Sequence, residues 1–540
     1  MMLRASRRRL AQTALVTAAA ATMPRSQAAA HQATPVPAEA AITAAQVDAA
    51  LARLDSLIEE GITQTGVPGT AVAVVYDDQV VYERGFGVRE LGQPEPITPE
   101  TVFQIASLSK ALSSTLVAAV VGDGMTTWDA TIGSLDPGFA LSDPWVSEQV
   151  AIRDMLCHRS GLPAYSGDPL VWSFLYDREE CIRRLRYYPL ATPFRTTWAY
   201  SNLGFSAGAY AAARAANQSW EDLAQARVFA PLGMSSTSYR FADFGRWENR
   251  AAPHYRTADG VWAPGDLTDD DAAAPAGGVS SNLRDLARWL RLHLAGGMVD
   301  GQQVVASDPL RETHRPQIVA ISPPDPAAGP TTFYGLGWFV TYDERGRLVV
   351  MHGGDFSGGY NTQATLLPAA GLGIVVLCNG WPSALREAIP KAFLEMVTRG
   401  APTQDWVPAI ETATAEALAS LLATSTPFPQ GQPPADALPS LPFDAYIGTY
   451  TNPTYGEVTV REEAGELVLA YGPHGVHRTL SPWTRDAFRM PLTGADAVPI
   501  AQLGVYFIIG AAGQADAALV SLGGVGPDAA ATFTRVMAGA

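Results

Sequence analysis

Short turns between strand-like segments are the strongest constraint on the fold of this chain. Residues 69–76 and 79–85 are strand-like runs on either side of Asp77 and Asp78, a pattern that predicts a β-hairpin. Much later, further runs follow one another at turn spacing, at residues 337–342, 348–352, 362–367 and 372–378. Because parallel strands need a crossover of a dozen or more residues, strands joined by such short turns should be antiparallel neighbours.

Helical segments surround these strands in the sequence. Thr43 and Gln46 form a capping-box pattern, and the apolar spacing over residues 47–62 predicts one amphipathic helix after it. Residues 103–121 and 283–294 also have helical periodicity, within a long insert punctuated by glycine and proline. The order strand pair, helical insert, strand meander and helix predicts an α/β (α+β) domain in which helices flank an antiparallel sheet.

A proline-rich segment separates this first domain, residues 43–400, from a C-terminal one. Residues 401–442 are interpreted as a helix followed by a linker with six prolines between 425 and 442. Such a linker predicts that few contacts connect the two domains. Beyond it, we expect a small all-β barrel over residues 443–540. Its strand-like runs lie at residues 445–451, 456–462, 466–471, 488–491 and 504–509.

The first 30 residues have the pattern of an export signal. Arg4 and the arginines at 7–9 precede an alanine-rich apolar stretch that is too short to cross a bilayer, and the alanines at 28–30 offer a cleavage site. Residues 6–10 resemble a twin-arginine signal, with a general secretory signal as the alternative. We therefore expect signal peptide 1–30, a tether over residues 31–42, and export to the periplasm or the medium.

Charge and cysteine content exclude several classes of protein. The 540-residue chain has a net charge of −16, which argues against nucleic acid as a partner. After the signal peptide no segment reaches about 18 uninterrupted apolar residues, so we expect no integral membrane span. We expect the three cysteines to be buried free thiols: Cys157, Cys181 and Cys378. We expect the aspartates at 269–271 to lie in a solvated loop. We expect a small-molecule substrate and neither metal nor cofactor; the oligomeric state stays open.

Ser107 and Lys110 form the motif with the most chemical content. Residues three apart share one face of a helix, so the serine hydroxyl can meet the lysine amine. A serine hydroxyl is a poor nucleophile without a base, and a desolvated, neutral lysine can act as that base. Lys110 is one of only two lysines in the chain, which limits the number of chance matches. A capping serine beside a surface lysine is the structural alternative.

Two further motifs carry groups that suit the same reaction. Tyr200 lies two residues before Asn202; a phenol near a lysine can relay a proton, and an asparagine amide can bind the lysine and a substrate carbonyl. His352, Gly353 and Gly354 lie at the end of a predicted strand, where glycines let a substrate backbone approach. Each has a structural alternative: a core tyrosine beside a capping asparagine, and a strand that ends in a glycine turn.

In this order the three motifs resemble the serine β-lactamase, penicillin-binding protein and family VIII esterase superfamily, whose pattern is S-x-x-K, then S-x-N or Y-x-N, then a K-T-G-like strand. The likeness is strongest to the class C-like branch of D-aminopeptidase-like serine hydrolases, and it spans about residues 45–400. His158, in one of the similar segments, is interpreted as a packing residue. The C-terminal domain is similar to the lipocalin-like domain often appended to this branch. In the first domain, the segments that carry the likeness besides the three motifs are residues 152–163, 231–234, 276–282, 334–338 and 376–379. The weaker likeness of the C-terminal domain is carried by residues 446–450, 455–456, 467 and 480–483.

The resemblance implies a role for each motif residue. Ser107 would be the nucleophile that forms an acyl-enzyme, and Lys110 and Tyr200 would share the general-base work. Asn202 would position the lysine and the substrate. The oxyanion hole would use the backbone N–H groups of Ser107 and Asp355. We therefore expect an exported serine hydrolase that cleaves small ester, amide or short peptide substrates.

The third motif departs from the family pattern. His352 replaces the lysine and Gly353 replaces the threonine with which the family binds the β-lactam carboxylate. A mostly neutral imidazole and a missing hydroxyl should weaken that recognition. An esterase or D-specific peptidase is therefore expected, with a true β-lactamase or DD-peptidase as the alternative. A non-catalytic binding protein on the same fold is a further alternative, against which the intact Ser107, Lys110 and Tyr200 argue.

Overall fold

The structure is a computed structural model that describes residues 42–536, except for residues 258, 324–329, 426–427, 430, 492–501 and 525–527. The expected signal peptide and residues 31–41 of the expected tether lie outside the described residues. Within the described part of the chain, no helix combines the length and the apolar character needed to cross a membrane.

The predicted hairpin and the predicted meander form one antiparallel sheet of eight strands, in the order β2-β1-β14-β13-β12-β11-β10-β9. β1 connects the two parts, since it pairs with β2 on one side and with β14 on the other. The strands are β1 (Gly69–Tyr76), β2 (Gln79–Gly87), β9 (Ile318–Ile321), β10 (Thr332–Tyr334), β11 (Phe339–Tyr342), β12 (Leu348–Phe356), β13 (Tyr360–Leu367) and β14 (Leu372–Cys378).

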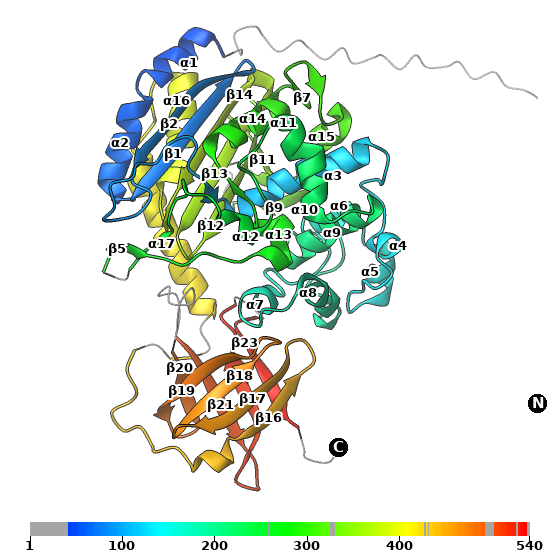
Figure 1. The fold of residues 1–540 in the computed structure, drawn as a ribbon, viewed down its shortest axis with the longest axis vertical. Coiled ribbons are helices and arrows are strands. Elements are labelled where there is room, and N and C mark those ends of the chain that lie inside the picture. The colour runs from blue at the N-terminus through cyan, green and yellow to red at the C-terminus, as the bar shows by residue number, and fades with distance from the viewer. Residues whose placement is uncertain are drawn as a thin grey trace, which may run out of the picture. The chain divides into compact units, whose positions relative to one another are not determined.

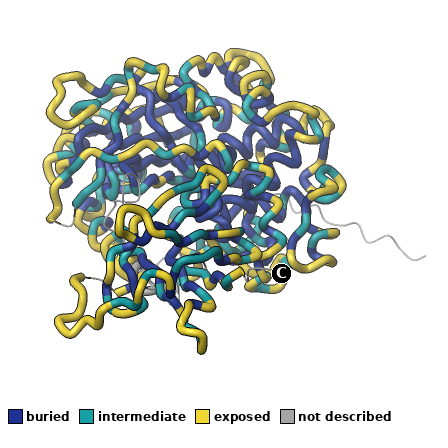
Figure 2. Tube along the Cα trace, turned by 60° about the horizontal axis from the view of Figure 1, so that its bottom comes forward, coloured by how far each residue is buried: buried dark blue, intermediate teal, exposed yellow. Residues whose placement is uncertain are grey.

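Helices cover both faces of this sheet, as predicted (Figure 1). The two sets of side chains of β1 alternate between two hydrophobic clusters: Ala71, Ala73 and Val75 belong to one, Val72 and Val74 to the other. Because both faces are covered, β1 and β14 are apolar along almost their whole length, and they lie in the buried centre of the domain (Figure 2). One cluster includes α3 (Ser109–Gly122) and α14 (Leu283–Leu294), and the other includes α1 (Ala44–Leu51), α2 (Leu54–Thr65) and α16 (Leu385–Arg399).

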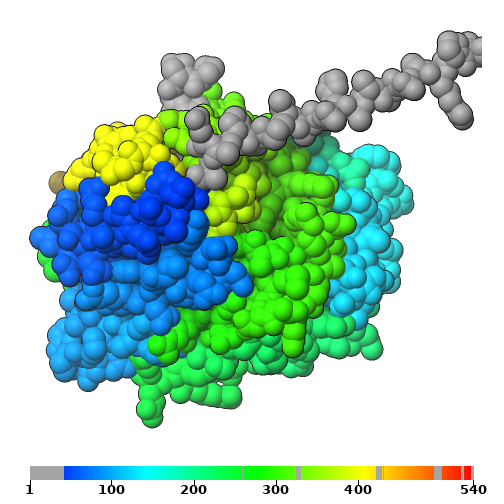
Figure 3. Space-filling model, turned by 90° about the horizontal axis from the view of Figure 1, so that it is seen from above, coloured from blue at the N-terminus to red at the C-terminus, as the bar shows by residue number. Residues whose placement is uncertain are grey.

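The first and last helices of the first domain lie side by side (Figure 3). Arg53 donates from Nη1 to the carbonyl oxygen of Gly400 at 3.0 Å, and Gln64 donates from Nε2 to Asp405 at 3.0 Å. α17 (Trp406–Ser425) follows this contact and leads toward the C-terminal domain. Segments more than 300 residues apart therefore close the same face of the sheet.

The single helix predicted after the capping box is in fact two helices. The capping box at the start of α1 is confirmed. Ala52 and Arg53 then separate α1 from α2, although Val47, Leu54 and Ile58 all remain buried in the same hydrophobic cluster. The apolar spacing thus predicted the buried face correctly but not the break.

The strand that carries the third motif is longer than predicted. β12 continues to Phe356 instead of ending at His352. β13 pairs with it opposite Gly353, Gly354 and Asp355, so these residues belong to the ladder. The two glycines therefore lie within the sheet, and the structural alternative of a strand that ends in a glycine turn is wrong.

The insert between β2 and β9 is mainly helical and carries small strand pairs. Its helices are α4 (Ile132–Leu135), α5 (Pro144–Gln149), α6 (Ile152–Leu156), α7 (Asp168–Trp172), α8 (Arg178–Arg184), α9 (Asn202–Ala215), α10 (Trp220–Ala224), α11 (Ala230–Leu232), α12 (Phe241–Phe244), α13 (Ala274–Gly277) and α15 (Ser307–Thr313). β3 (Phe103–Gln104) pairs with β6 (Ser280–Ser281), β7 (Met298–Val299) with β8 (Gln302–Gln303), and β4 (His254–Arg256) with β5 (Trp262–Pro264) and β15 (Gly380–Trp381).

The C-terminal domain is a closed antiparallel barrel of eight strands, which confirms the predicted all-β barrel. The sequence pattern predicted five of them and missed β19, β22 and β23. β19 contains Pro482, where its register with β20 shifts, and β22 is rich in alanine, which is depleted in strands. The strands are β16 (Gly448–Asn452), β17 (Gly456–Glu463), β18 (Glu466–Tyr471), β19 (Val476–Thr484), β20 (Ala487–Met490), β21 (Leu503–Ile509), β22 (Ala515–Ser521) and β23 (Ala530–Arg535).

A pair of buried histidines packs against α3. Nδ1 of His293 lies 3.0 Å from Nε2 of His314, and Nε2 of His293 lies 2.9 Å from Oγ1 of Thr115. The Thr115 hydroxyl donates its proton to the carbonyl oxygen of Ala111, so His293 donates to Thr115 and accepts from His314. Burial lowers the pKa of His314 to about 4 and that of His293 well below its usual range, which keeps both imidazoles neutral.

Replacing His314 with glutamine should make the fold less sensitive to acid. Below pH 6.5 an unfolded histidine binds a proton that the buried one does not, so the free energy of unfolding falls as the pH decreases. One such group accounts for about 2 kcal/mol between pH 7 and pH 5, and His314→Gln should remove that share while keeping a donor to His293. Urea unfolding followed by tryptophan fluorescence at pH 7 and pH 5 measures this change in the free energy of unfolding. The exposed His474→Gln is the control; an equal pH dependence for His314→Gln and the parent would contradict the prediction.

Candidate active site

Ser107 lies in a tight turn rather than in a regular helix. It is the middle residue of the 3-10 turn η2 (Ala106–Leu108), which precedes α3 and Lys110. Ala106 has a φ of 50°, a left-handed conformation that alanine rarely adopts and that tends to occur at functional sites. The turn brings Lys110 Nζ to 3.2 Å from Ser107 Oγ, so the structure places the two residues of the first motif together.

The amine of Lys110 is fully buried and has three hydrogen-bond partners. Besides Ser107 Oγ, it lies 2.7 Å from Oδ1 of Asn202 and 2.9 Å from the carbonyl oxygen of Ala276 on α13. Both of these oxygens can only accept, so each binds an N–H of the lysine. A neutral amine has two N–H groups and one lone pair, and this arrangement leaves the lone pair for the Ser107 hydroxyl.

Tyr200 and Asn202 reach the site from the start of α9. Ser201 caps this helix, because its hydroxyl accepts a hydrogen bond from the first turn at 3.0 Å. The Ser107 side chain acts to lower the pKa of the Tyr200 phenol, and the centroid of the Tyr200 ring lies 4.6 Å from Lys110 Nζ. The structure therefore brings together the four residues for which catalytic roles were predicted.

His158 packs directly on Tyr200, as its interpretation as a packing residue predicted. The two ring centroids are 4.5 Å apart, and the backbone N–H of Ser201 donates to Nδ1 of His158 at 3.2 Å. Trp198 and Tyr334 contact the same pair of rings. Burial and the nearby charge of Lys110 lower the pKa of His158, so a neutral imidazole supports the phenol and the helix cap together.

Two buried carboxylates close to Lys110 were missed by the motif analysis. Asp168, the first residue of α7, accepts from Nδ2 of Asn202 at 3.2 and 3.1 Å. Asp270 is buried and accepts from Trp172 Nε1 at 3.1 Å, so the solvated loop predicted around it is wrong at its middle residue. Neither aspartate belongs to a motif with the lysine, and only the packing of the insert brings them to it.

Burial controls the protonation of the site. It lowers the pKa of Lys110 to about 7, while the negative charges of Asp270 and Asp168 act in the opposite direction. Burial raises the pKa of both carboxyl groups, and it raises the pKa of Tyr200 well above its usual range. At neutral pH the site therefore holds a protonated phenol beside a lysine that can lose its proton.

His352 contributes no positive charge to the site. Its Nδ1 lies 2.7 Å from the carbonyl oxygen of Gly353, which can only accept, and its Nε2 lies 2.9 Å from the Tyr334 hydroxyl. Nδ1 therefore carries the proton and Nε2 accepts one from the tyrosine. Burial lowers the pKa of His352 to about 3, so the imidazole stays neutral even at pH 6.

Arg386 provides a positive charge beside the same strand. It lies at the start of α16 and donates from Nη1 to Oδ2 of Asp355 at 2.6 Å and to the carbonyl oxygen of Gly354 at 3.3 Å. Its side chain is 18% exposed and that of Asp355 is 45% exposed. Arg386 follows Asp355 by 31 residues and belongs to no motif, so the sequence contained no local signal for this pair.

Gly354 allows β12 to approach the turn that carries the serine. A Cβ at this position would lie 2.1 Å from the carbonyl oxygen of Ile105 and 2.9 Å from the backbone nitrogen of Leu108. Thr362 of β13 donates to the same Ile105 oxygen at 2.7 Å. Two strands of the sheet therefore hold the backbone on either side of Ser107, and this contact explains the glycine.

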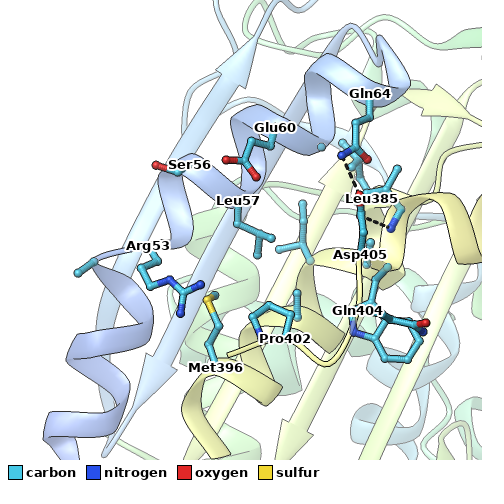
Figure 4. A pocket seen from close by; sticks show the side chains of 17 residues that line it. Arg53, Ser56, Leu57, Glu60, Gln64, Leu385, Met396, Pro402, Gln404 and Asp405 are labelled. Atoms are coloured by element: carbon cyan, nitrogen blue, oxygen red, sulfur yellow. Dashed lines mark hydrogen bonds between the residues drawn. The ribbon is translucent and has the colours of Figure 1, made fainter. Parts of the chain in front are cut away.

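A hollow of about 450 Å³ lies elsewhere, between α2, α16 and the start of α17 (Figure 4). Leu57, Leu385 and Met396 line its apolar part, and the hydrogen bond between Gln64 and Asp405 borders it. The residues that line this hollow include none of the motif residues. It is therefore separate from the candidate active site.

Comparison with protein families divides the chain as the fold does. A family model described as Beta-lactamase matches residues 54–394, which include the sheet, the insert and all the motif residues. A second model, described as a domain of unknown function (DUF3471), matches residues 432–535, which include the barrel.

Individual relatives cover much of the chain. It is 26% identical over 477 residues to an unguisins hydrolase of Aspergillus campestris, a match to 82% of this chain and 84% of that protein. It is 28% identical over 327 residues to penicillin-binding protein 4 of Amycolatopsis lactamdurans, a match to 59% of this chain and 82% of that protein. A solved octameric penicillin-binding protein homologue from Pyrococcus abyssi shares the fold, with a TM-score of 0.57 and 19% identity over 87% of this chain and 98% of that one.

Replacing Gly354 with alanine should reduce the reactivity of Ser107. The added methyl group would push β12 away from η2, and a displacement of about 1 Å at a reacting group costs roughly 100-fold in rate. We expect a fluorophosphonate probe to label Ser107 about 10- to 100-fold more slowly. The control is Gly245→Ala, where the nearest atom to the new methyl group lies 3.8 Å away. Labelling of Gly354→Ala at the parent rate would show that the close approach is not required.

Proposed function

The chain belongs to the beta-lactamase family, and we propose that it is a serine hydrolase that cleaves small ester or amide bonds through an acyl-enzyme on Ser107. The buried amine of Lys110 is the observation that carries this proposal. It lies 3.2 Å from the serine hydroxyl, while Asn202 and Ala276 bind its N–H groups. A surface lysine beside a capping serine, the structural alternative, would have neither this burial nor these partners.

The proposed reaction starts with transfer of the Ser107 proton to neutral Lys110. Oγ then bonds to the substrate carbonyl carbon, and the backbone N–H groups of Ser107 and Asp355 bind the resulting oxyanion. The tetrahedral intermediate expels an alcohol or amine, which takes the proton from the lysine with Tyr200 as a relay. Water, deprotonated by the same lysine, next attacks the acyl carbon. When the bond to Oγ breaks, the lysine returns its proton to Oγ, which releases the acid and restores the Ser107 hydroxyl.

Lys110, rather than Tyr200, is the base in this proposal. Burial lowers the pKa of the amine and raises that of the phenol, so near neutral pH the amine is the group available without its proton. Tyr200 remains protonated, and its hydroxyl is a donor that can stabilise charge on the Ser107 oxygen. His158, packed on its ring, keeps the phenol in position.

Esters and short amide or peptide substrates are proposed in preference to β-lactams. The strand position of His352 offers a neutral imidazole to a β-lactam carboxylate, and Gly353 offers no hydroxyl. Arg386 lies near the same strand, but its guanidinium already binds Asp355. The loss of one charge-assisted hydrogen bond costs about 1.5–3 kcal/mol, or roughly 10- to 150-fold in rate. A hydrolase and a penicillin-binding protein among the relatives support acyl transfer as the reaction.

Export is also proposed, on the pattern of the first 30 residues alone. Arginines precede a short apolar stretch and an alanine-rich cleavage site, which favours removal of this segment during export. The enzyme would then act in the periplasm or in the medium. Substrates that reach this compartment, rather than cytoplasmic metabolites, are the ones to test.

Ser107→Ala should abolish hydrolysis and covalent labelling without unfolding the protein. The hydroxyl is the proposed nucleophile, so its removal takes away the atom that forms the acyl-enzyme. A panel of p-nitrophenyl esters of different length, D- and L-aminoacyl anilides and nitrocefin measures turnover, with the exposed Ser134→Ala as the matched control. Unchanged hydrolysis in Ser107→Ala would refute the assignment.

The same panel separates the alternative functions. We expect measurable turnover of small esters or anilides and slow or absent turnover of nitrocefin. A kcat/KM for nitrocefin above that for the best ester would make the protein a β-lactamase. A parent protein that neither turns over the panel nor is labelled by a fluorophosphonate at Ser107 would favour the non-catalytic binding protein.

The value of kcat/KM should rise with pH through about pH 7. The base is active only when Lys110 has lost its proton, so each pH unit below its pKa removes about nine-tenths of the active form. His352, with a pKa of about 3, adds no titration in the range from pH 5 to pH 9, whereas Asp270, whose pKa burial raises to about 7, titrates together with Lys110. Lys110→Met should lower kcat by about 10²- to 10⁴-fold and abolish this rise of kcat/KM with pH, the acidic limb of the profile. Lys391→Met, at the other lysine, should keep the parent kcat and the acidic limb. Persistence of the limb in Lys110→Met would assign it to another group.

A further inference from the structure

The C-terminal barrel contributes one buried carboxylate to the contact between the domains. Asp528, just before β23, is 1% exposed. Its Oδ1 accepts from the Tyr455 hydroxyl of the barrel at 2.6 Å. Its Oδ2 accepts from the backbone N–H of Gly167 at 2.7 Å and from the Tyr188 hydroxyl at 3.3 Å, both in the first domain. One side chain therefore binds the two domains to each other with polar contacts away from solvent.

A short series of hydrogen bonds leads from this carboxylate to the catalytic lysine. Asp168, the residue after Gly167, accepts from Nδ2 of Asn202 with both carboxylate oxygens. Oδ1 of the same amide accepts from Lys110. Both ends of the Asn202 amide are thus engaged, and a shift of the turn that carries Asp168 would rotate the amide away from the lysine.

Several other contacts hold the barrel against α7. The Ser173 hydroxyl donates to the carbonyl oxygen of Leu522 at 2.8 Å. The Phe174 ring stacks on those of Tyr455 and Phe533, with centroids 5.6 and 6.5 Å apart. These contacts contradict the expectation that few would connect the domains. They also mean that the position of Asp528 is fixed by the packing of the barrel itself.

Asp528 adds negative charge as well as hydrogen bonds. Burial raises its pKa to about 6, and the hydrogen bonds from Tyr455, Gly167 and Tyr188 act in the opposite direction. Its charge contributes to the raised pKa of Asp168. The carboxylate is therefore held where it acts on the group that binds Asn202.

We propose that Asp528 is a positioning residue for hydrolysis, through which the barrel keeps Asp168, Asn202 and Lys110 in their working arrangement. This inference rests on the proposed function, because it assumes that Lys110 is the base. Asp528 touches none of the reacting atoms. It acts by fixing the turn at Gly167, so the barrel is required for the chemical step and not only for the choice of substrate.

Substitution of Asp528 in the full-length protein tests the inference. Asp528→Ala should lower kcat for the best p-nitrophenyl ester about 10- to 100-fold, because the lysine amine is displaced, and should leave KM within about threefold. Asp528→Asn keeps one oxygen that can accept from Gly167, so it should retain more activity than the alanine variant. Ser173→Ala is the matched control: it removes a hydrogen bond across the same interface without touching the series that leads to Lys110, and its kcat should stay within about twofold of the parent value.

A double-mutant cycle distinguishes positioning from general damage to the interface. If Asp528 acts through Asp168, Asp528→Ala combined with Asp168→Asn should be no slower than Asp168→Asn alone, whereas independent effects would multiply. Four results would overturn this inference and leave the proposed function standing. They are losses that multiply in the double variant, a change confined to KM, an equal loss of kcat in Ser173→Ala, and a parent-like kcat in Asp528→Ala. Absence of Ser107-dependent turnover in the parent protein would instead overturn the proposed function, and this inference with it.

Discussion

A lysine amine cannot remain charged away from water unless acceptors surround it, and Lys110 is placed under this constraint by the packing of α3. The cost of burial lowers its pKa, and the neutral form needs only two acceptors for its N–H groups. Asn202 and Ala276 supply them. The remaining lone pair faces Ser107, so the desolvation that would destabilise a charged lysine favours the neutral amine that the proposed reaction needs as its base.

The elements that satisfy this amine come from distant parts of the chain. α3 carries the lysine, the capped start of α9 carries Asn202, and α13 presents the carbonyl oxygen of Ala276. The sheet fixes the remaining side, because Gly354 and Thr362 hold β12 and β13 against the turn of Ser107. Charge is kept low throughout: the nearby imidazoles of His158 and His352 are neutral, and burial favours the protonated forms of the surrounding carboxyl groups.

The sequence was most informative where function or fold depends on local spacing. Ser107 with Lys110, and Tyr200 with Asn202, each fall within a single turn of chain, and the strand runs of the sheet are separated by recognisable turns. The partners that complete the site depend on tertiary packing instead. Asp168 and Arg386 come to it from separate segments, Asp528 contacts the turn before Asp168, and no periodicity links the three residues to the motifs. The same distinction explains two of the missed barrel strands. The alanines of β22 and Pro482 of β19 weaken the local strand pattern, and pairing with neighbouring strands determines the structure there.

The place of β1 in the sheet has a consequence for synthesis of the chain. Thr70 pairs with Cys378, 308 residues later, so β1 has only β2 as a neighbour while the ribosome makes the insert. At roughly 5–20 residues per second, this interval lasts about 15–60 s. During that time a long apolar strand has an open edge, which is the kind of surface that pairs with other chains. The topology therefore requires that the edge of the nascent hairpin be protected from other chains until β14 is made.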